Sequence, residues 1–189
     1  MSDPKQKYFV QSNFKREASD HYPTIDKRCT FGLLEHVQPV SSIDVCAPTG
    51  SGIVEVLKKC GYDSRCIGDA FTPGVRTQWI ITNPPYERPL VDQIIERQIQ
   101  RIADGEVFGV AMLLRTSFDH ATTRKVIFKS CEFYHGQIKL LFRPWWNIER
   151  KKGPIHNYVW HLWTGLAGTP VVLYSNGLQP LTYKQNDKE

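Results

Sequence analysis

Hydrophobic and polar positions along the chain change their period several times, and each change marks a predicted element. Strands are expected over residues 42–47, 65–69, 79–82 and 107–114, and the last two are apolar or β-branched runs typical of buried strands. Segments with apolar residues three and four positions apart lie between these runs, which is the spacing of one helix face. Strands that alternate with helices in this way predict an α/β domain built on a mostly parallel sheet.

Four helices are predicted from the spacing of apolar residues. The first covers Ile25, Cys29, Leu33 and Leu34 with Thr24 as its N-cap, and the second covers Ile53, Val56, Leu57 and Cys60 and ends at Gly61. The third follows Pro89 with Leu90, Ile94, Ile95, Ile99 and Ile102, and the fourth covers residues 119–131 with Val126, Ile127 and Cys131 facing inward. Gly61 suits a helix end because glycine adopts the left-handed conformation found there.

The last third of the chain is richer in strands. Residues 137–142 alternate loosely, and residues 157–163 predict an antiparallel partner for them. At 189 residues the chain is long enough for one α/β domain and too short for two ordinary ones. We expect a flexible arm over residues 1–19, a single domain over 20–179 and a flexible tail over 180–189.

Composition excludes several classes of protein. No apolar run approaches the roughly 20 residues of a membrane span, and the polar N-terminus lacks a signal-peptide core. The five cysteines are scattered and form no C-x-x-C pair, so we expect reduced cysteines in a cytoplasmic protein and no metal site. The net charge of +5 is a weak indication of a polyanionic partner.

One stretch carries candidate chemistry at the end of a predicted strand. Ile80, Ile81 and Thr82 finish an apolar run, and Asn83-Pro84-Pro85-Tyr86 follows. Two consecutive prolines cannot continue a strand ladder or a helix because neither has an N–H to donate. An amide side chain and an aromatic ring are therefore expected at the carboxyl edge of the sheet, where ligands bind in open α/β folds.

A second candidate lies upstream, in the glycine loop 48–52 between a predicted strand and a predicted helix. Glycines in such a loop allow a ligand to approach the backbone, and the following helix N-terminus favours a carboxylate or phosphate. A phosphate-binding loop is the alternative, but no Lys follows Gly52.

Asn83-Pro84-Pro85-Tyr86 resembles the catalytic motif of S-adenosylmethionine-dependent amino-methyltransferases. Together with Tyr22-Pro23-Thr24 and the Arg-Pro-x-Trp segment that begins at Arg143, the motif order resembles small phage-type DNA N6-adenine methyltransferases. The resemblance implies a Rossmann-like methyltransferase sheet with a C-terminal antiparallel hairpin. Only about a dozen residues separate Asp69 from the motif, so we expect the usual third strand to be missing and the sheet to be shortened at that edge.

The resemblance also implies roles for residues. Catalysis would fall to Asn83, Pro84, Pro85 and Tyr86, and S-adenosylmethionine would contact Tyr22, Thr24, Asp44, Cys46, Pro48, Gly50, Gly52, Asp69 and Asn83. The family usually carries an acidic residue where Cys46 stands. Asp44, two positions earlier on the same side of the strand, is the expected substitute. Asp69 would hold the cofactor ribose, or it is a turn residue.

The loop between the last two predicted strands combines cations with aromatic rings, a composition that suits phosphate contacts and base stacking. The nucleic-acid-binding candidates are Arg143, Trp145, Trp146, Arg150, Lys151, Lys152 and His156. Two core tryptophans beside a solvated run of charges are the alternative interpretation.

These observations predict methylation of the N6 amino group of adenine in DNA. RNA adenine or a protein glutamine is the alternative substrate, and a non-catalytic nucleic-acid-binding protein on a degenerate methyltransferase fold is the alternative from another class.

Overall fold

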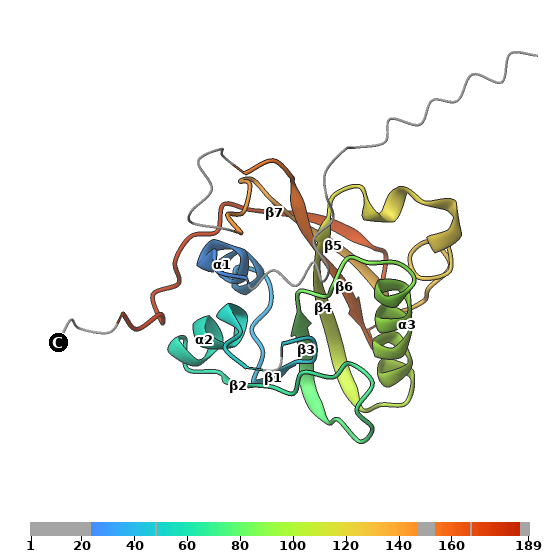
Figure 1. Ribbon diagram of the computed structural model, residues 1–189, viewed down its shortest axis with the longest axis horizontal. Coiled ribbons are helices and arrows are strands. Elements are labelled where there is room, and N and C mark those ends of the chain that lie inside the picture. The colour runs from blue at the N-terminus through green and yellow to red at the C-terminus, as the bar shows by residue number, and fades with distance from the viewer. Residues whose placement is uncertain (1–23, 48, 147–153, 167, 186–189) are drawn as a thin grey trace, which may run out of the picture.

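The computed structural model of the protein describes residues 24–47, 49–146, 154–166 and 168–185, and its elements follow one another as Figure 1 shows. The helices are α1 (Lys27–Leu34), α2 (Gly52–Lys59) and α3 (Leu90–Ala103). The strands are β1 (Ser41–Asp44), β2 (Asp63–Cys66), β3 (Thr77–Thr82), β4 (Val107–Arg115), β5 (Tyr134–Leu140), β6 (Tyr158–Thr164) and β7 (Val171–Ser175).

The strands of the described residues form one sheet in the order β2-β1-β3-β4-β6-β5-β7. The first four run parallel to one another, β6 is antiparallel to both β4 and β5, and β7 is parallel to β5. The predicted α/β fold with a mostly parallel sheet and an antiparallel C-terminal hairpin is therefore confirmed. β7 at the outer edge was not predicted.

The sheet is short at the β2 edge, as predicted, because the chain passes from β2 to β3 without another strand. Residues 67–76 make this connection and lie against α3. There the buried Gln98 side chain donates from its amide nitrogen to the Ala70 carbonyl at 2.9 Å, and Arg101 bonds the carbonyls of Ala70 and Thr72. Ala70 and Val75 are buried among the apolar residues on this face of the sheet.

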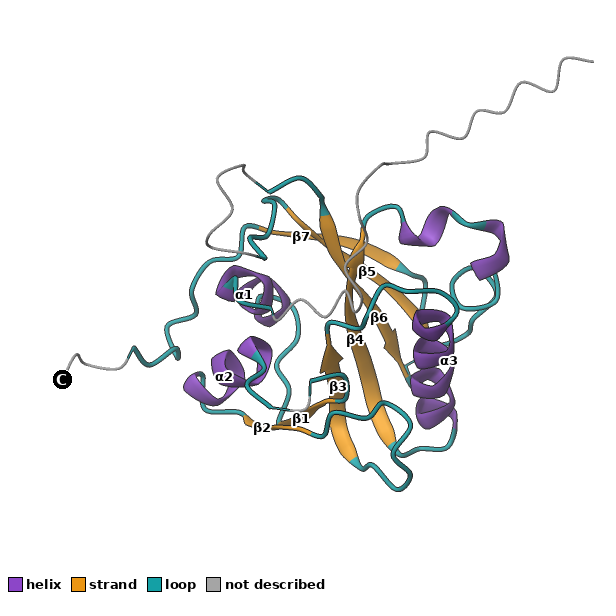
Figure 2. Cartoon of the chain, in the orientation of Figure 1, coloured by secondary structure: helices purple, strands orange, loops and turns teal. Residues whose placement is uncertain are grey.

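Two apolar cores lie on the two faces of the sheet, with α1 and α2 on one side and α3 on the other (Figure 2). β6 contributes one fully buried tryptophan to each core, Trp160 to one and Trp163 to the other. Side chains alternate between the two faces along a strand, so positions an odd number apart point to opposite faces. The Trp160 indole donates to the Cys29 carbonyl of α1, and the Trp163 indole donates to the Ile127 carbonyl, both at 2.8 Å.

Three local predictions were wrong. Residues 119–131 do not form a helix, because the extended Ala121 separates two 3₁₀ turns, Phe118–His120 and Thr122–Arg124, and Val126 is exposed. The cap of α1 is Asp26, whose side chain accepts from the Arg28 N–H at 3.2 Å.

The third correction concerns the buried face of α3. That face is formed by Val91, Ile94, Ile95, Gln98, Arg101 and Ile102, whereas Leu90 is exposed and Ile99 only partly buried. The chain after β7 also has a packing role, since the Tyr183 ring meets the Phe31 ring of α1 edge to face at 5.1 Å.

None of the helices in the described residues has the length and apolar character needed to cross a membrane. The same residues contain no group of three or more His, Cys, Asp or Glu side chains arranged to hold a metal ion. The cysteines at 29, 46, 60, 66 and 131 are all free thiols.

Candidate active site

Two neighbouring parallel strands end side by side at the carboxyl edge of the sheet and bring the two sequence candidates together. β1 ends at Asp44 and leads into the glycine loop, while β3 ends at Thr82 and leads directly into Asn83. The Thr82 hydroxyl donates a 2.6 Å hydrogen bond to Asp44, so the two strand ends are joined by their side chains.

Asp44 is a buried carboxylate at the centre of this junction. Its Oδ1 also accepts from the backbone N–H groups of Cys46 and Ala47, at 3.1 and 3.3 Å. Its Oδ2 accepts from the Ser51 hydroxyl at 2.6 Å. Burial raises the pKa of Asp44, and these hydrogen bonds act in the opposite direction. Asp44 therefore shapes the glycine loop from inside the fold, in addition to any contact with a ligand.

Ser51 was not singled out from the sequence, yet it connects Asp44 to α2. Besides donating to Asp44, its hydroxyl oxygen caps the helix by accepting from the Val54 N–H at 3.4 Å. The signal was present, because serine directly before an apolar-periodic segment is a common N-cap.

The two glycines of the loop have different roles. Gly50 has φ +67° and is exposed, and apart from its chain neighbours no heavy atom of the described residues lies within 4 Å of the place where a Cβ would stand. At Gly52 a Cβ would stand 2.0 Å from the Thr24 carbonyl oxygen, so this glycine allows the preceding chain to pass. Open space for a ligand therefore lies at Gly50, and Thr24 is held beside the loop through its backbone.

Cys46 precedes this loop and carries a thiol in place of a carboxylate, while the carboxylate of Asp69, which follows β2, is already engaged. Burial raises the pKa of Cys46 to about 12, so its thiol is neutral at neutral pH. Asp69 is exposed, and its carboxylate closes its own turn by accepting from the Phe71 N–H at 2.8 Å and the Thr72 hydroxyl at 3.1 Å. The turn interpretation of Asp69 describes these contacts, while its ribose-binding role stays a prediction.

Tyr86 is anchored beside Asn83. Its hydroxyl donates to Asn83 Oδ1 at 2.5 Å and also lies 3.2 Å from the Leu113 carbonyl oxygen of β4. The ring is partly buried and packs against the cores on both faces of the sheet. Pro84 is buried and Pro85 half-buried, so the motif is fixed in the fold instead of projecting from it.

A cluster of aromatic rings and one cation surrounds Tyr86. The Arg115 guanidinium lies over the Tyr86 ring at 5.6 Å, and the Tyr158 ring lies 6.0 Å away. Trp146 meets Tyr158 edge to face at 4.8 Å, which brings the predicted nucleic-acid loop into the site. Burial raises the pKa of Tyr158, while the neighbouring Arg115 opposes the shift. Sequence reasoning assigned no role to Arg115 or Tyr158.

The other described candidates of this loop lie farther out. Trp145 is exposed by 38%, its N–H donates to Asp26 at 3.1 Å, and with the start of α1 it lines a cavity of about 340 Å³. Arg143 is exposed and donates from Nε to Asn157 Oδ1 at 3.1 Å, and His156 is exposed. Five other candidates lie outside the described residues: Tyr22, Pro48, Arg150, Lys151 and Lys152.

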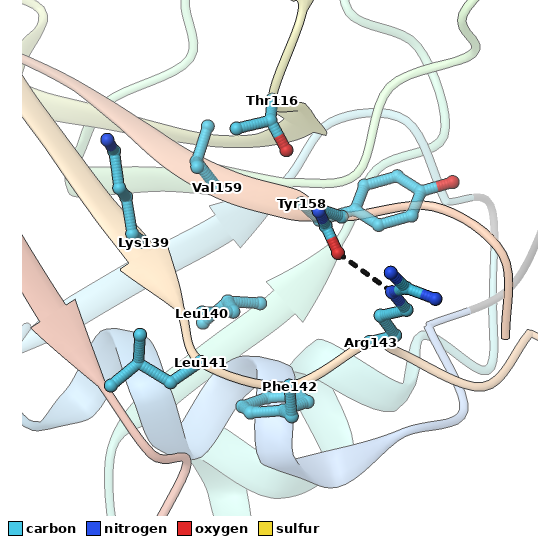
Figure 3. Close-up of a pocket in the computed structure, with 9 residues that line it drawn as sticks. Thr116, Lys139, Leu140, Leu141, Phe142, Arg143, Tyr158 and Val159 are labelled. Carbon is cyan, nitrogen blue, oxygen red and sulfur yellow. Dashed lines mark hydrogen bonds between the residues drawn. The ribbon is translucent and has the colours of Figure 1, made fainter.

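A second cavity, of about 330 Å³, opens between the ends of β4, β5 and β6 (Figure 3). Thr116, Lys139, Arg143 and Tyr158 are among its lining residues. Tyr158 thus borders both this cavity and the cluster around Tyr86.

Of the comparisons with known proteins, the one with solved structures supports the fold, and none gives a family. No family model matches the sequence, and no curated protein matches it. Among solved structures, the chain is similar to a proposed RNA methyltransferase from Pyrococcus horikoshii, with a TM-score of 0.50 and 12% identity. The match covers 74% of this chain and 82% of the other. At this identity the likeness concerns the fold alone, which is that of a methyltransferase-like α/β domain.

Proposed function

We propose that this protein is an S-adenosylmethionine-dependent methyltransferase that acts on the N6 amino group of adenine in DNA. The observation that carries the proposal is the junction at the carboxyl edge of the sheet. Asn83 directly follows the residue whose hydroxyl bonds Asp44, and Asp44 holds the start of the glycine loop that contains Gly50. A methyl donor bound at the loop and a target held by the motif would therefore be neighbours.

The described residues of the loop fit the methionine end of the cofactor. The space beside Gly50 is open, and the first turn of α2 follows at once, where a carboxylate is favoured by the helix N-terminus. Thr24 and Cys46 lie beside this loop, Asp69 follows the neighbouring strand β2, and Tyr22 and Pro48 complete the set implied by the resemblance. When bound, S-adenosylmethionine supplies an electrophilic methyl group.

The motif would act on the nitrogen that receives this methyl group. The adenine amino nitrogen is a poor nucleophile because its lone pair is delocalised into the ring. Asn83 Oδ1 and the Pro84 carbonyl oxygen would accept its two hydrogens, which localises the lone pair and stabilises the transition state more than the ground state. No strong base is needed, since the methylated amine loses a proton readily.

Tyr86 would position the base. Its hydroxyl is fixed by Asn83 and Leu113, so its ring is held in one orientation before a substrate arrives. A stacking surface that is already ordered lowers the entropy lost when the target is aligned with the methyl group.

RNA adenine is a second candidate substrate, because the similar solved structure is described as a proposed RNA methyltransferase. A non-catalytic nucleic-acid-binding protein is the candidate from another class. The neutral Cys46 thiol and the four donors that already engage Asp44 support this candidate. The ordered Asn83–Tyr86 pair supports catalysis instead.

Transfer of labelled methyl from S-adenosylmethionine to DNA, RNA and protein, measured in parallel, tests the proposal. We expect label in DNA as N6-methyladenine, and label in RNA alone would select the second candidate. Calorimetric titration with S-adenosylmethionine separates the classes, since absence of binding together with absence of transfer would leave only the non-catalytic candidate.

A further inference from the structure

The cavity between the ends of β4, β5 and β6 has a chemistry that the motifs do not explain. It is lined mainly by apolar groups, with the side chains of Lys139 and Arg143 on either side of Leu140 in Figure 3. None of the described residues that line it is acidic. Neither cation forms an ion pair with a carboxylate of the described residues, since Arg143 bonds an amide and Lys139 lies 5.9 Å above the Tyr174 ring.

One of the lining residues, Thr116, also carries a polar atom that lacks a partner among the described residues. The Thr116 hydroxyl oxygen is buried and forms no hydrogen bond with the described residues. Its backbone N–H donates to the Asn157 carbonyl oxygen at 3.1 Å, which holds the main chain at this position. A buried hydroxyl without a partner costs free energy that a bound anion would recover. Two cations, an unpartnered hydroxyl on a lining residue and no acidic residue among those described make the cavity complementary to an anion.

We propose that this cavity holds a backbone phosphate of the nucleic-acid strand whose adenine lies at Tyr86, with Lys139, Arg143 and Thr116 as its partners. This inference rests on the proposed function, since it takes the strand to be the substrate. Tyr158 supplies the connection, because it lines the cavity while its ring lies 6.0 Å from Tyr86. Phosphate contacts fix the register of a strand and carry no sequence information, which suits a single domain with a small recognition surface.

Equilibrium binding to a fluorescent single-stranded DNA oligonucleotide with one adenine tests the inference, with the RNA equivalent alongside. Each phosphate contact on a single strand contributes about 0.7 to the slope of log affinity against log salt. We expect Lys139→Gln to reduce that slope by about 0.7. The matched control is Lys58→Gln, which removes an exposed lysine in the last turn of α2, at the opposite edge of the sheet, and is expected to leave the slope unchanged.

A scan with neutral methylphosphonates locates the contact. One modified linkage near the adenine should weaken binding to the parent protein, and the same linkage should weaken binding to Lys139→Gln less, because only Arg143 and Thr116 remain as partners. Thr116→Val removes a hydroxyl and no charge, so we expect roughly tenfold weaker binding with an unchanged slope, the loss of one hydrogen bond to a charged group. Thermal unfolding of each variant excludes misfolding as the cause.

The inference is overturned if the parent binds neither oligonucleotide, or if Lys139→Gln and Lys58→Gln give the parental slope. Binding is measured without cofactor, so the outcome is separate from that of the methyl-transfer assay. If the salt slopes are as expected but no methyl is transferred, only the catalytic proposal is contradicted. If methyl is transferred to DNA but the salt slope of Lys139→Gln equals that of the parent, only the phosphate assignment is contradicted.

Discussion

The Thr82 hydroxyl donates a 2.6 Å hydrogen bond to the Asp44 carboxylate. Thr82 is fully buried and Asp44 is 3% exposed, so water does not compete for this bond. Because Asn83 follows Thr82 and the glycine loop follows Asp44, the bond fixes the distance between the proposed catalytic and cofactor residues. Stability and activity should therefore both depend on it.

Thr82→Val keeps the shape of the side chain and removes the donor, so one acceptor position of a buried carboxylate loses its partner. We expect a loss of about 1–3 kcal/mol in the free energy of unfolding. Thr30→Val is the matched control, because Thr30 is also fully buried but its hydroxyl has no partner in the described residues. Urea unfolding of both variants should show a loss for Thr82→Val and little change for Thr30→Val. Equal losses would assign the effect to packing.

The pKa of Asp44, raised mainly by burial, predicts a pH dependence of stability. In the unfolded chain an aspartate has a pKa of about 3.9. Because the folded state binds the proton more tightly, ionisation costs the folded state stability as the pH rises from that value through the folded pKa. Asp44→Asn removes this titration, keeps an oxygen for the Oδ1 donors, and places an amide N–H toward the Ser51 hydroxyl oxygen.

We therefore expect the free energy of unfolding of the parent, relative to Asp44→Asn, to fall as the pH is raised from about 4. Chemical unfolding of both proteins across the acid range measures this difference, and other titrating groups cancel in it. A parent that gains stability relative to the variant over the same range would mean that the four hydrogen bonds outweigh burial.

Asn83→Ala should slow methyl transfer by about 10²–10³, by analogy with loss of one donor from an oxyanion hole. The effect on the transfer rate should exceed the effect on cofactor affinity, because the lost oxygen is the proposed acceptor for the target amine and only one of several expected cofactor contacts. Single-turnover transfer gives the rate, and calorimetry gives the affinity. Asn176→Ala, an exposed asparagine after β7, is the control. If Asn83→Ala transfers methyl at the parental rate, the motif has only a structural role.

Gly50→Asn tests the open space in the glycine loop. Asparagine tolerates positive φ better than other residues with a side chain, so the fold should be retained while the side chain enters the space. We expect S-adenosylmethionine binding to be lost with little change in melting temperature. Gly105→Asn is the control, since Gly105 has the same φ of +67° and equally open surroundings after α3. A Gly50→Asn protein that still binds the cofactor would place the ligand elsewhere.

Local patterns predicted the elements that local chemistry determines. The apolar face of α2 follows from Ile53, Val56 and Leu57, all of which are buried, and the continuous apolar run of β4 is buried along nearly its whole length. The two prolines after Asn83 end β3 where the sequence indicated. In each case a short segment contains the whole signal.

Contacts between distant segments explain what could not be predicted. The Arg124 guanidinium donates to the Phe118 carbonyl at 2.7 Å and to Asp92 of α3 at 2.8 Å. These bonds stabilise a non-helical conformation of residues 118–124. Arg101 is completely buried although its charge predicts exposure. Its guanidinium donates to a carbonyl of the loop between β2 and β3, which forms no helix or strand hydrogen bond. The cluster around Tyr86 joins positions 115, 146 and 158, and no spacing rule relates these.

Replacing each of the two tryptophans in the loop after β5 with alanine is expected to affect a different property of the protein. Trp145 is 38% exposed, so Trp145→Ala should leave the melting temperature nearly unchanged. If Trp145 stacks on a base, the variant should lose about 1–3 kcal/mol of strand affinity with little change in the salt slope. Trp146 packs on Tyr158, so Trp146→Ala should destabilise the fold by about 2 kcal/mol, less than the loss of a fully buried tryptophan.

Trp146→Phe separates packing from specific contact, because it keeps an aromatic ring against Tyr158 and should recover most of the stability. Thermal unfolding and fluorescence anisotropy with a single-stranded oligonucleotide are measured on all three variants. The expected pattern is an affinity defect alone for Trp145→Ala and a stability defect for Trp146→Ala that the Phe variant largely repairs. If Trp145→Ala binds the strand as tightly as the parent, its exposure marks an ordinary surface residue. Arg143 and His156 would then be the described candidates of this loop that remain for contact with nucleic acid, because Trp146 packs on Tyr158.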